Sequence, residues 1–363
     1  MAVIFKPFLS DDVTTARTLL HESIPIAASI VSGTYGAFGT NERNIKNYSH
    51  GMFQSVYDYP YMSSSANHVF DIACGYSSLS PLSASGNNQN SKKIAIYNQL
   101  AQVLVGHDVT GSILRFDKDG DLTSGGISSG KLDEVYFINL SRLTIKDEIK
   151  KGTFNLQIQT GSAHNTSVST AGTLMTIQDH GAETEYRVNS PAGEYGILYS
   201  GSQATAGTGV GLLYYQAGIA VLTGSIFKIA NRNDGTQKQG STTIMTQTTE
   251  NIDALLTGST IQIASDSIRH RINSLSFNNT TELNSTIYFC RIGHNEFNYS
   301  ANPTYTSGSR IRVKNQTTDQ PVSYFTTVGL YSADNELLAV AKLSEPIRKD
   351  PTNELMLRVR LDY

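Results

Sequence analysis

The stretch that decides the fold is Gly211-Leu-Leu-Tyr-Tyr-Gln-Ala-Gly-Ile-Ala-Val-Leu222, in which two apolar runs flank Gln216-Ala-Gly218. Neither run alternates between apolar and polar residues. The sequence therefore predicts a β-hairpin that is buried on both faces. The surrounding segment from Tyr195 to Phe227 carries no charged side chain, which indicates a separate module or a buried interface.

Short strands are predicted on both sides of this hairpin, because β-branched and aromatic residues recur between Gly, Ser and Thr turns. Upstream we expect strands at Glu134–Leu140, Gly152–Thr160, Leu174–Gln178, Tyr186–Asn189 and Gly196–Tyr199. Downstream we expect them at Ser285–Ile292, Arg310–Lys314, Ser323–Tyr331, Glu336–Lys342 and Leu355–Tyr363. A turn at residues 332–335 joins two of these as a hairpin. The last strand is expected to turn its Leu, Val and Tyr residues inward.

Helices are predicted at three places. Asp11 and Asp12 can cap a helix that runs to Glu22, and apolar residues at three- and four-residue spacing predict another from Ser91, as N-cap, to Gly106. A short helix is expected near residues 250–256. The segment 141–150 is compatible with a strand or a helical turn, and residues 77–90 read as a loop.

The fold class predicted from these elements is mainly β, with a mixed α+β N-terminal part and multi-domain β-sandwich-like modules. Charge is uneven along the chain: residues 1–151 hold 13 Lys and Arg, residues 152–260 hold 4, and residues 261–363 hold 11. We therefore expect three domains, namely 1–151, a charge-poor Gly/Ser/Thr-rich module at 152–260, and a C-terminal domain at 261–363.

The composition of the 363 residues favours some classes of protein over others. Ser, Thr, Asn and Gly make up 36% of the chain and charged residues only 16%, which is typical of β-rich extracellular and virion proteins. A net charge of −3 without basic runs argues against nucleic acid or an anionic membrane as a partner. No secretory signal and no 18-residue apolar run is visible. Cys74 and Cys290 are expected to be small buried hydrophobes.

Motifs that carry chemistry are not found, so the sequence predicts no enzyme, no catalytic residue, no cofactor and no metal. The eight histidines form no HxH, HxxxH or HExxH pair, and no nucleophile elbow or phosphate-binding loop occurs. Asp117-Lys-Asp-Gly-Asp121 resembles the start of a calcium loop, but Leu122 replaces the required Gly and Ser128 the required Glu. We expect a turn with solvated carboxylates there, and weak calcium binding stays open.

Tyrosine is the one side chain that suggests a binding surface, since the chain holds 19 Tyr and no Trp. Tyr combines an apolar ring with a polar tip and is favoured both in cores and at interfaces. Core packing or a subunit interface is favoured over sugar binding. The candidate interface residues are Phe53, Tyr57, Tyr59, Tyr61, Tyr214 and Tyr215.

The C-terminal hairpin resembles a recurring element of bacteriophage tail-fibre and baseplate proteins. The resemblance lies in Thr327-Val-Gly-Leu-Tyr331, a short turn, and Asn335-Glu-Leu-Leu-Ala-Val-Ala-Lys-Leu343. In that element, Gly allows close sheet packing and a Val/Leu face is buried. Further stretches resemble virion structural proteins of T4-like tailed phages, especially those of marine bacteria and cyanobacteria. These stretches are residues 48–53, 94–102, 135–142, 146–151 and 211–222.

The resemblance implies a non-enzymatic structural subunit of a phage tail or baseplate. Its expected partners are other virion structural proteins, and it is expected to be a homo-oligomer or part of a symmetric assembly. Its expected location is the virion, assembled in the host cytoplasm. Because no heptad or collagen-like repeat occurs, a globular subunit is expected rather than a fibre shaft. The alternatives are a neck, collar or capsid-decorating protein, a glycan-binding adhesin, and a polysaccharide depolymerase.

Overall fold

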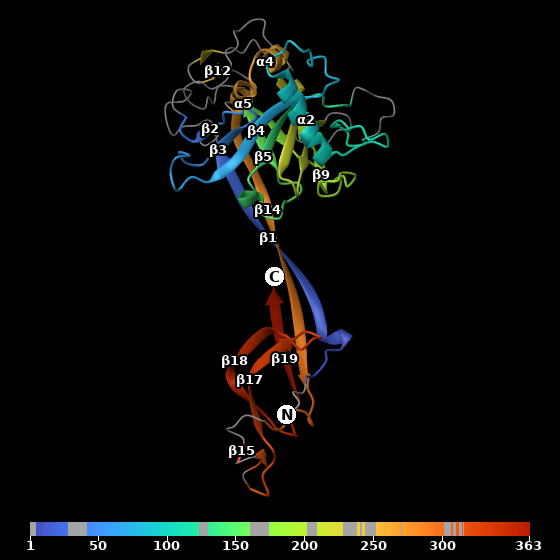
Figure 1. Cartoon of the computed structure of the whole chain (residues 1–363), viewed down its shortest axis with the longest axis vertical. Coiled ribbons are helices and arrows are strands. Elements are labelled where there is room, and N and C mark those ends of the chain that lie inside the picture. The colour runs from blue at the N-terminus through green and yellow to red at the C-terminus, as the bar shows by residue number, and fades with distance from the viewer. Residues whose placement is uncertain are drawn as a thin grey trace. The chain divides into compact units, whose positions relative to one another are not determined.

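The chain forms two compact units, one of Met1–Leu19 with Glu282–Tyr363 (unit 1) and one of Leu20–Thr281 (unit 2). Their elements are labelled in Figure 1. The computed structural model describes residues 5–27, 42–122, 130–159, 174–201, 209–227, 238–239, 242–243, 252–269, 271–300, 306–307, 310–311, 314 and 316–363. The predicted fold class is confirmed, because strands predominate and only a few helices accompany them.

Unit 2 is built on one large antiparallel sheet. Along the sheet the strand order is β1-β14-β7-β8-β9-β10-β11-β5-β4-β3-β2, and β6 also pairs with β14. Two of these strands, β1 (Val13–Ala27) and β14, continue from unit 2 into unit 1. The strands are β2 (Ile45–Asn47), β3 (Gln54–Tyr57), β4 (His68–Tyr76), β5 (Glu134–Leu140), β6 (Glu148–Ile149), β7 (Asn155–Gln159), β8 (Leu174–Gln178), β9 (Tyr195–Ser200), β10 (Gly209–Tyr214), β11 (Ile219–Thr223) and β14 (Ile272–Ile292). Two short strands, β12 (Lys238–Gln239) and β13 (Thr242–Thr243), pair with each other.

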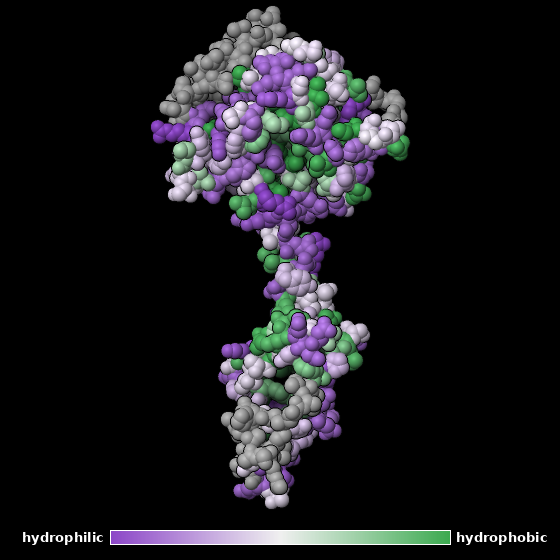
Figure 2. Space-filling view, in the orientation of Figure 1, coloured by the Kyte–Doolittle hydropathy of each residue, from purple (hydrophilic) through white to green (hydrophobic). Residues whose placement is uncertain are grey.

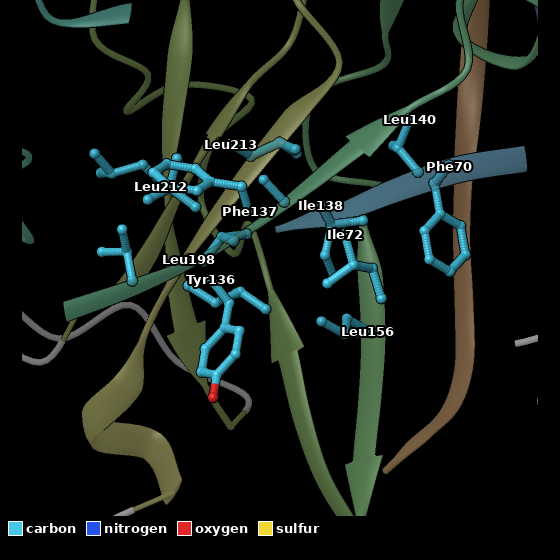
Figure 3. Close-up of a cluster of buried hydrophobic side chains, with 14 of the residues drawn as sticks. Phe70, Ile72, Tyr136, Phe137, Ile138, Leu140, Leu156, Leu198, Leu212 and Leu213 are labelled. Atoms are coloured by element: carbon cyan, nitrogen blue, oxygen red, sulfur yellow. The ribbon is translucent and has the colours of Figure 1, made fainter. Parts of the chain in front are cut away.

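The predicted central hairpin is confirmed as β10 and β11. Leu213 pairs with Ala220 and Tyr214 with Ile219, and every residue of β10 is buried. The turn brings Gly218, at φ +68°, so close to Ile145 that a Cβ atom there would lie 2.5 Å from its Cδ1. Figure 3 shows how the apolar side chains of β4, β5, β7, β9 and β10 gather in the interior.

Helices cover both faces of this sheet. The helix α2 (Asn90–Leu104) lies against β4 at Gly75, and its Tyr97 packs edge-on against Phe116 at a ring distance of 5.3 Å. The helix α5 (Ile261–Arg269) contacts the opposite face, where Asp266 accepts a hydrogen bond from Gln54. Gln54 pairs with Ile72 of β4, so the two side chains lie on the same face of the sheet. Ile72 and Gly75 lie on opposite faces, because side chains alternate along a strand. The two helices therefore cover opposite faces of the sheet at β4. This explains why the central strands β9, β10 and β11 are apolar at nearly every position.

The start of α2 differs from the prediction. Gln89 is the N-cap, in the left-handed region at φ 53°, so Ser91 does not cap the helix. Lys93 is buried, and its Nζ donates hydrogen bonds to the carbonyls of Leu256 and Ser259 at 2.6 and 2.7 Å. Those carbonyls end the helix α4 (Ile252–Gly258), where a positive charge is favourable. A lysine near the start of α2 is unfavourable, because the helix dipole is positive there. The hydrogen bonds of Lys93 to the end of α4 compensate for this. The predicted end of this helix, near Gly106, is confirmed.

The predicted helix from Asp11 to Glu22 is wrong. Only Ser10–Asp12 are helical, as the 3-10 turn η1, and the chain continues as the strand β1 (Val13–Ala27). β1 pairs with β14, and the amide of Glu22 donates to Asn279 Oδ1 at 3.1 Å. The β-branched residues at its start favour extended backbone, and the partner strand supplies hydrogen bonds that an isolated helix would make internally.

Several smaller predictions also differ from the structure. Residues 186–189 form no strand but a single bridge between Arg187 and Tyr195. The ambiguous segment 141–150 contains both a helical turn, α3 (Arg142–Ile145), and β6. The short turn η2 (Gly224–Phe227) follows β11. The helix α5 was not predicted. The three-domain division stays a prediction, although strands from either side of residue 151 pair within one sheet.

Unit 1 has a much smaller strand system. β19 (Leu355–Asp362) pairs antiparallel with β14, from Ser285 opposite Asp362 to Ile292 opposite Leu355. β17 (Ser323–Tyr331) and β18 (Leu337–Lys349) form the predicted hairpin as a two-stranded sheet, and β15 (Thr306–Ser307) pairs with β16 (Arg310–Ile311). The expected alternation along β19 is confirmed, except at Tyr363, which is 75% exposed rather than inward.

A substitution at Gly75 tests the close packing of α2 on β4. A Cβ atom there would lie 2.6 Å from the backbone oxygen of Lys93, so the helix must move. We expect Gly75→Ala to lower the free energy of unfolding of unit 2 by about 1–3 kcal/mol. Urea unfolding followed by far-UV circular dichroism measures this, because the chain has no Trp. Gly86→Ala is the control, since no atom lies within 4 Å of a Cβ there. Equal stability of the two variants would contradict the packing argument.

Candidate functional site

Three of the predicted interface tyrosines lie together at the edge of the sheet in unit 2. Tyr57 ends β3, and its ring lies 6.3 Å from the ring of Tyr61 and 5.5 Å from that of His68. Tyr59 and Tyr61 are 48% and 39% exposed. Burial raises the pKa of Tyr57, and Tyr48 and Asp71 raise it further. Tyr59 and Tyr61 therefore offer aromatic surface to solvent.

Phe53, the candidate interface residue that precedes these three tyrosines in the sequence, belongs to a separate cluster of rings. Its ring lies 4.9 Å from that of Tyr48 and 5.0 Å from that of His50, and the Tyr48 and His50 rings are stacked. The ammonium of Lys46 lies 4.8 Å from the centre of the Tyr48 ring. Phe53 is half-buried, so most of its contacts are made within its own unit.

A Ser, an Asp and a His also meet beside these rings. Ser55 Oγ donates to Asp71 Oδ1 at 2.5 Å, and His68 Nε2 lies 2.7 Å from the same oxygen. Both groups contact the carboxylate, so the imidazole does not stand between the hydroxyl and the carboxylate. A nucleophilic triad needs that intermediate position. The arrangement orients His68 under the Tyr57 ring and does not activate Ser55.

Tyr214 and Tyr215 were predicted at an interface, and this is corrected by their burial. They are 1% and 0% exposed in the chain itself. The Tyr214 ring lies 5.0 Å from that of Tyr195, and the Tyr215 hydroxyl donates to Asp179 Oδ2 at 3.1 Å. The described parts of the charge-free segment that contains them supply β9, β10 and β11, whose residues are mostly buried in the core of unit 2. A charge-free sequence marks burial but does not say against what.

Asp179 is the buried carboxyl beside Tyr215. It also accepts hydrogen bonds from the amides of Gly152 at 2.7 Å and Phe154 at 3.0 Å. Burial raises its pKa to about 6, although these three donors act in the opposite direction. The carboxyl joins the chain before β7 to the end of β10, and its role is to hold these segments together.

The resemblance to a calcium loop does not extend to the structure. Asp117 was expected to be solvated, but it is 3% exposed and forms an ion pair with Lys131. Its Oδ1 also accepts the amide of Asp119 at 2.9 Å, in a turn where Gly120 has φ +68°. Ser128 lies outside the described residues. Within the described part of the chain, no group of three or more His, Cys, Asp or Glu side chains is placed to hold a metal ion.

The two cysteines differ in their surroundings. Cys74 is fully buried, as expected, and burial raises its pKa to about 12. Cys290 is only half-buried, in β14. Neither is part of a disulfide.

Unit 1 contains a cavity of about 600 Å³. It is lined mainly by aromatic and aliphatic side chains. A polar contribution comes from Asp12 and Arg291, whose Oδ1 and Nε lie 2.6 Å apart. The apolar lining includes Phe5, Phe8, Phe289, Phe297, Phe325 and Leu330. An apolar cavity of this size is large enough for a small ligand or for side chains of another protein.

The hairpin β17–β18 next to this cavity exposes apolar side chains. Its Val/Leu face was expected to be buried, but only Leu330 is, at 6% exposure. Leu337, Leu338 and Val340 are 52%, 68% and 53% exposed. This exposed surface was not predicted. Alternation along a strand separates its two faces, but it does not show which face the rest of the same chain covers.

Comparison of the chain with protein-family models, with curated proteins and with solved structures finds no match. None of the helices in the described residues is long and apolar enough to cross a membrane.

Asp179 makes the stability of unit 2 depend on pH. Its folded pKa of about 6 lies above the ordinary value of 3.8, so the folded state holds the proton more tightly. The contribution to stability is complete below pH 4 and is lost as the pH rises through 6. We expect the free energy of unfolding, relative to Asp179→Asn, to fall by up to about 3 kcal/mol between these limits. Urea titrations across this range measure it, and a difference that stays constant with pH would contradict the assignment.

Proposed function

We propose that the chain is a non-enzymatic structural subunit of a tailed-phage virion, in the tail or baseplate. It holds neighbouring subunits or fibres in place by protein–protein contacts. Its partners are other virion structural proteins, including further copies of itself, and it is assembled into the particle in the host cytoplasm.

One coincidence carries this proposal. The hairpin that resembles tail-fibre and baseplate proteins is the same hairpin, β17–β18, that exposes Leu337, Leu338 and Val340. Soluble monomers rarely leave large apolar side chains clustered at the surface, and such clusters mark sites of protein contact. A subunit of a particle covers them when it assembles.

Unit 2 supports the proposal by its construction. Its sheet is covered on both faces, so it is a rigid body with a closed core. Such a body suits a protein whose work is mechanical, because packed interiors transmit strain and resist deformation. The buried Asp179 and Lys93, which in a cleft would suggest catalysis, are bound to backbone groups and hold segments together.

A glycan-binding adhesin is the second candidate. Tyr59 and Tyr61 favour it, because exposed aromatic rings near one another can contact sugars. Under this alternative, the purified chain binds host-surface polysaccharide, and Tyr61→Ala weakens that binding. Tyr186→Ala is the control, since Tyr186 is 36% exposed elsewhere in unit 2. Equal binding by both variants would remove this alternative.

Quantitative mass spectrometry of gradient-purified particles, after separation of heads from tails, tests the proposal. We expect the chain in the tail fraction at a multiple of three or six copies per particle, as closed symmetry requires. Enrichment with heads would reject the tail or baseplate position in favour of a neck, collar or capsid-decorating role. Absence from particles would reject the structural role.

A further inference from the structure

Unit 1 does not form a closed core of its own. Among its described residues, the buried hydrophobic side chains are Ile292, Leu330 and Val359. The large contiguous core of the chain lies wholly in unit 2. A compact unit is stabilised mainly by the apolar area that it removes from water, so three buried residues leave unit 1 poorly supported.

The missing apolar contacts correspond to side chains that unit 1 leaves in solvent. Leu338 and Val340 are two residues apart in β18 and therefore point to the same face of the hairpin. On other elements, Leu9 and Met356 are 65% and 63% exposed. Figure 2 shows hydrophobic surface on unit 1 in the region of β18 and β19. Leu337 lies on this face as well, because a Cβ atom at Gly329, which pairs with Val340, would lie 3.2 Å from Leu337 Cδ1, next to a break in the strand register. We call the side chains of Leu337, Leu338 and Val340 the outer face of the hairpin.

The charges of unit 1 are balanced, unlike those of the whole chain. Residues 1–19 and 282–363 hold eleven Lys and Arg and eleven Asp and Glu, whereas the chain carries −3. Both signs occur on neighbouring exposed strands: Arg358 is on β19 and Glu345 on β18, and both side chains face solvent. Two copies of unit 1 therefore carry no net charge by which they would repel each other.

Strand edges in unit 1 are also open. Among the described residues, β17 and β18 pair only with each other, and β19 pairs only with β14. Unpaired backbone groups along a strand edge can pair with another chain. The surface thus offers apolar side chains, balanced charges and free backbone groups in one unit.

We propose that unit 1 associates with unit 1 of a second copy of this chain, and that the contact covers the outer face of the hairpin. A symmetric contact brings the same patch of both copies together, so an apolar patch covers its own counterpart, and the zero net charge of unit 1 adds no net repulsion between the copies. This association does not depend on the virion role.

The test compares full-length variants by sedimentation velocity over a range of concentrations. We expect the unaltered chain to self-associate and Leu338→Glu to weaken the association at least about tenfold, because a charge replaces a leucine that the contact buries. Leu143→Glu is the matched control: Leu143 is 74% exposed, but it lies in α3 of unit 2. It should leave the association unchanged. Both leucines are exposed, so the far-UV spectra should not change.

Three outcomes would overturn the proposal. A chain that is monomeric at every concentration has no such contact. If it is monomeric and also binds a fluorescent fatty acid, the apolar cavity serves a small ligand instead. If Leu143→Glu disrupts association and Leu338→Glu does not, the contact lies on unit 2. None of these results changes whether the chain is found in particles, so the two proposals fail separately.

Discussion

Burial of the central strands on both faces is the constraint on which unit 2 depends. β10 is buried at every position, and β5 and β11 at nearly every position, so helices must cover both sides of the sheet. Gly75 allows α2 to come close enough to cover one side. Lys93 then ties the start of α2 to the end of α4 by hydrogen bonds to backbone carbonyls. The close approach of α2 at Gly75 and the burial of the Lys93 ammonium are both consequences of covering the sheet with helices.

The strands of unit 1 are not buried on both faces, and this difference explains why the unit exposes apolar side chains. It has a two-stranded hairpin and short paired strands, with no helix longer than a 3-10 turn among its described residues. The side chains of its outer face, Leu337, Leu338 and Val340, are therefore left exposed by the described residues of the unit. The chain thus combines unit 2, which has a large core of its own, with unit 1, which leaves large apolar side chains exposed, and such side chains are the feature from which we propose a contact with another polypeptide.

Much of the strand order along the chain could be predicted from the sequence, because apolar runs and turn residues are local signals. The hairpins β10–β11 and β17–β18 and the helix α2 are examples. The helix α5 was missed because charged residues are buried along it beside its apolar ones: Asp266 and Arg269 are buried and lie 2.9 Å apart. β1 was read as a helix because its partner, β14, is far away in the sequence.

The candidate site was less predictable than the fold. Tyr57, Tyr59 and Tyr61 were placed together correctly, but Tyr214 and Tyr215 are core residues. Composition shows that a tyrosine prefers to be partly buried and does not show whether its own chain or another one buries it. The same limit applies to Leu338, since its 68% exposure follows from how the described parts of unit 1 fold and not from its place in the strand.

Hydrogen–deuterium exchange at several protein concentrations tests the central claim most directly, since it reports the two units separately. Backbone amides of β4, β5, β10 and β11 should be protected at every concentration. Amides of β17, β18 and β19 should exchange quickly in dilute solution and become protected as the concentration rises. Protection of these three strands in dilute solution, equal to that of β10 and independent of concentration, would contradict the account.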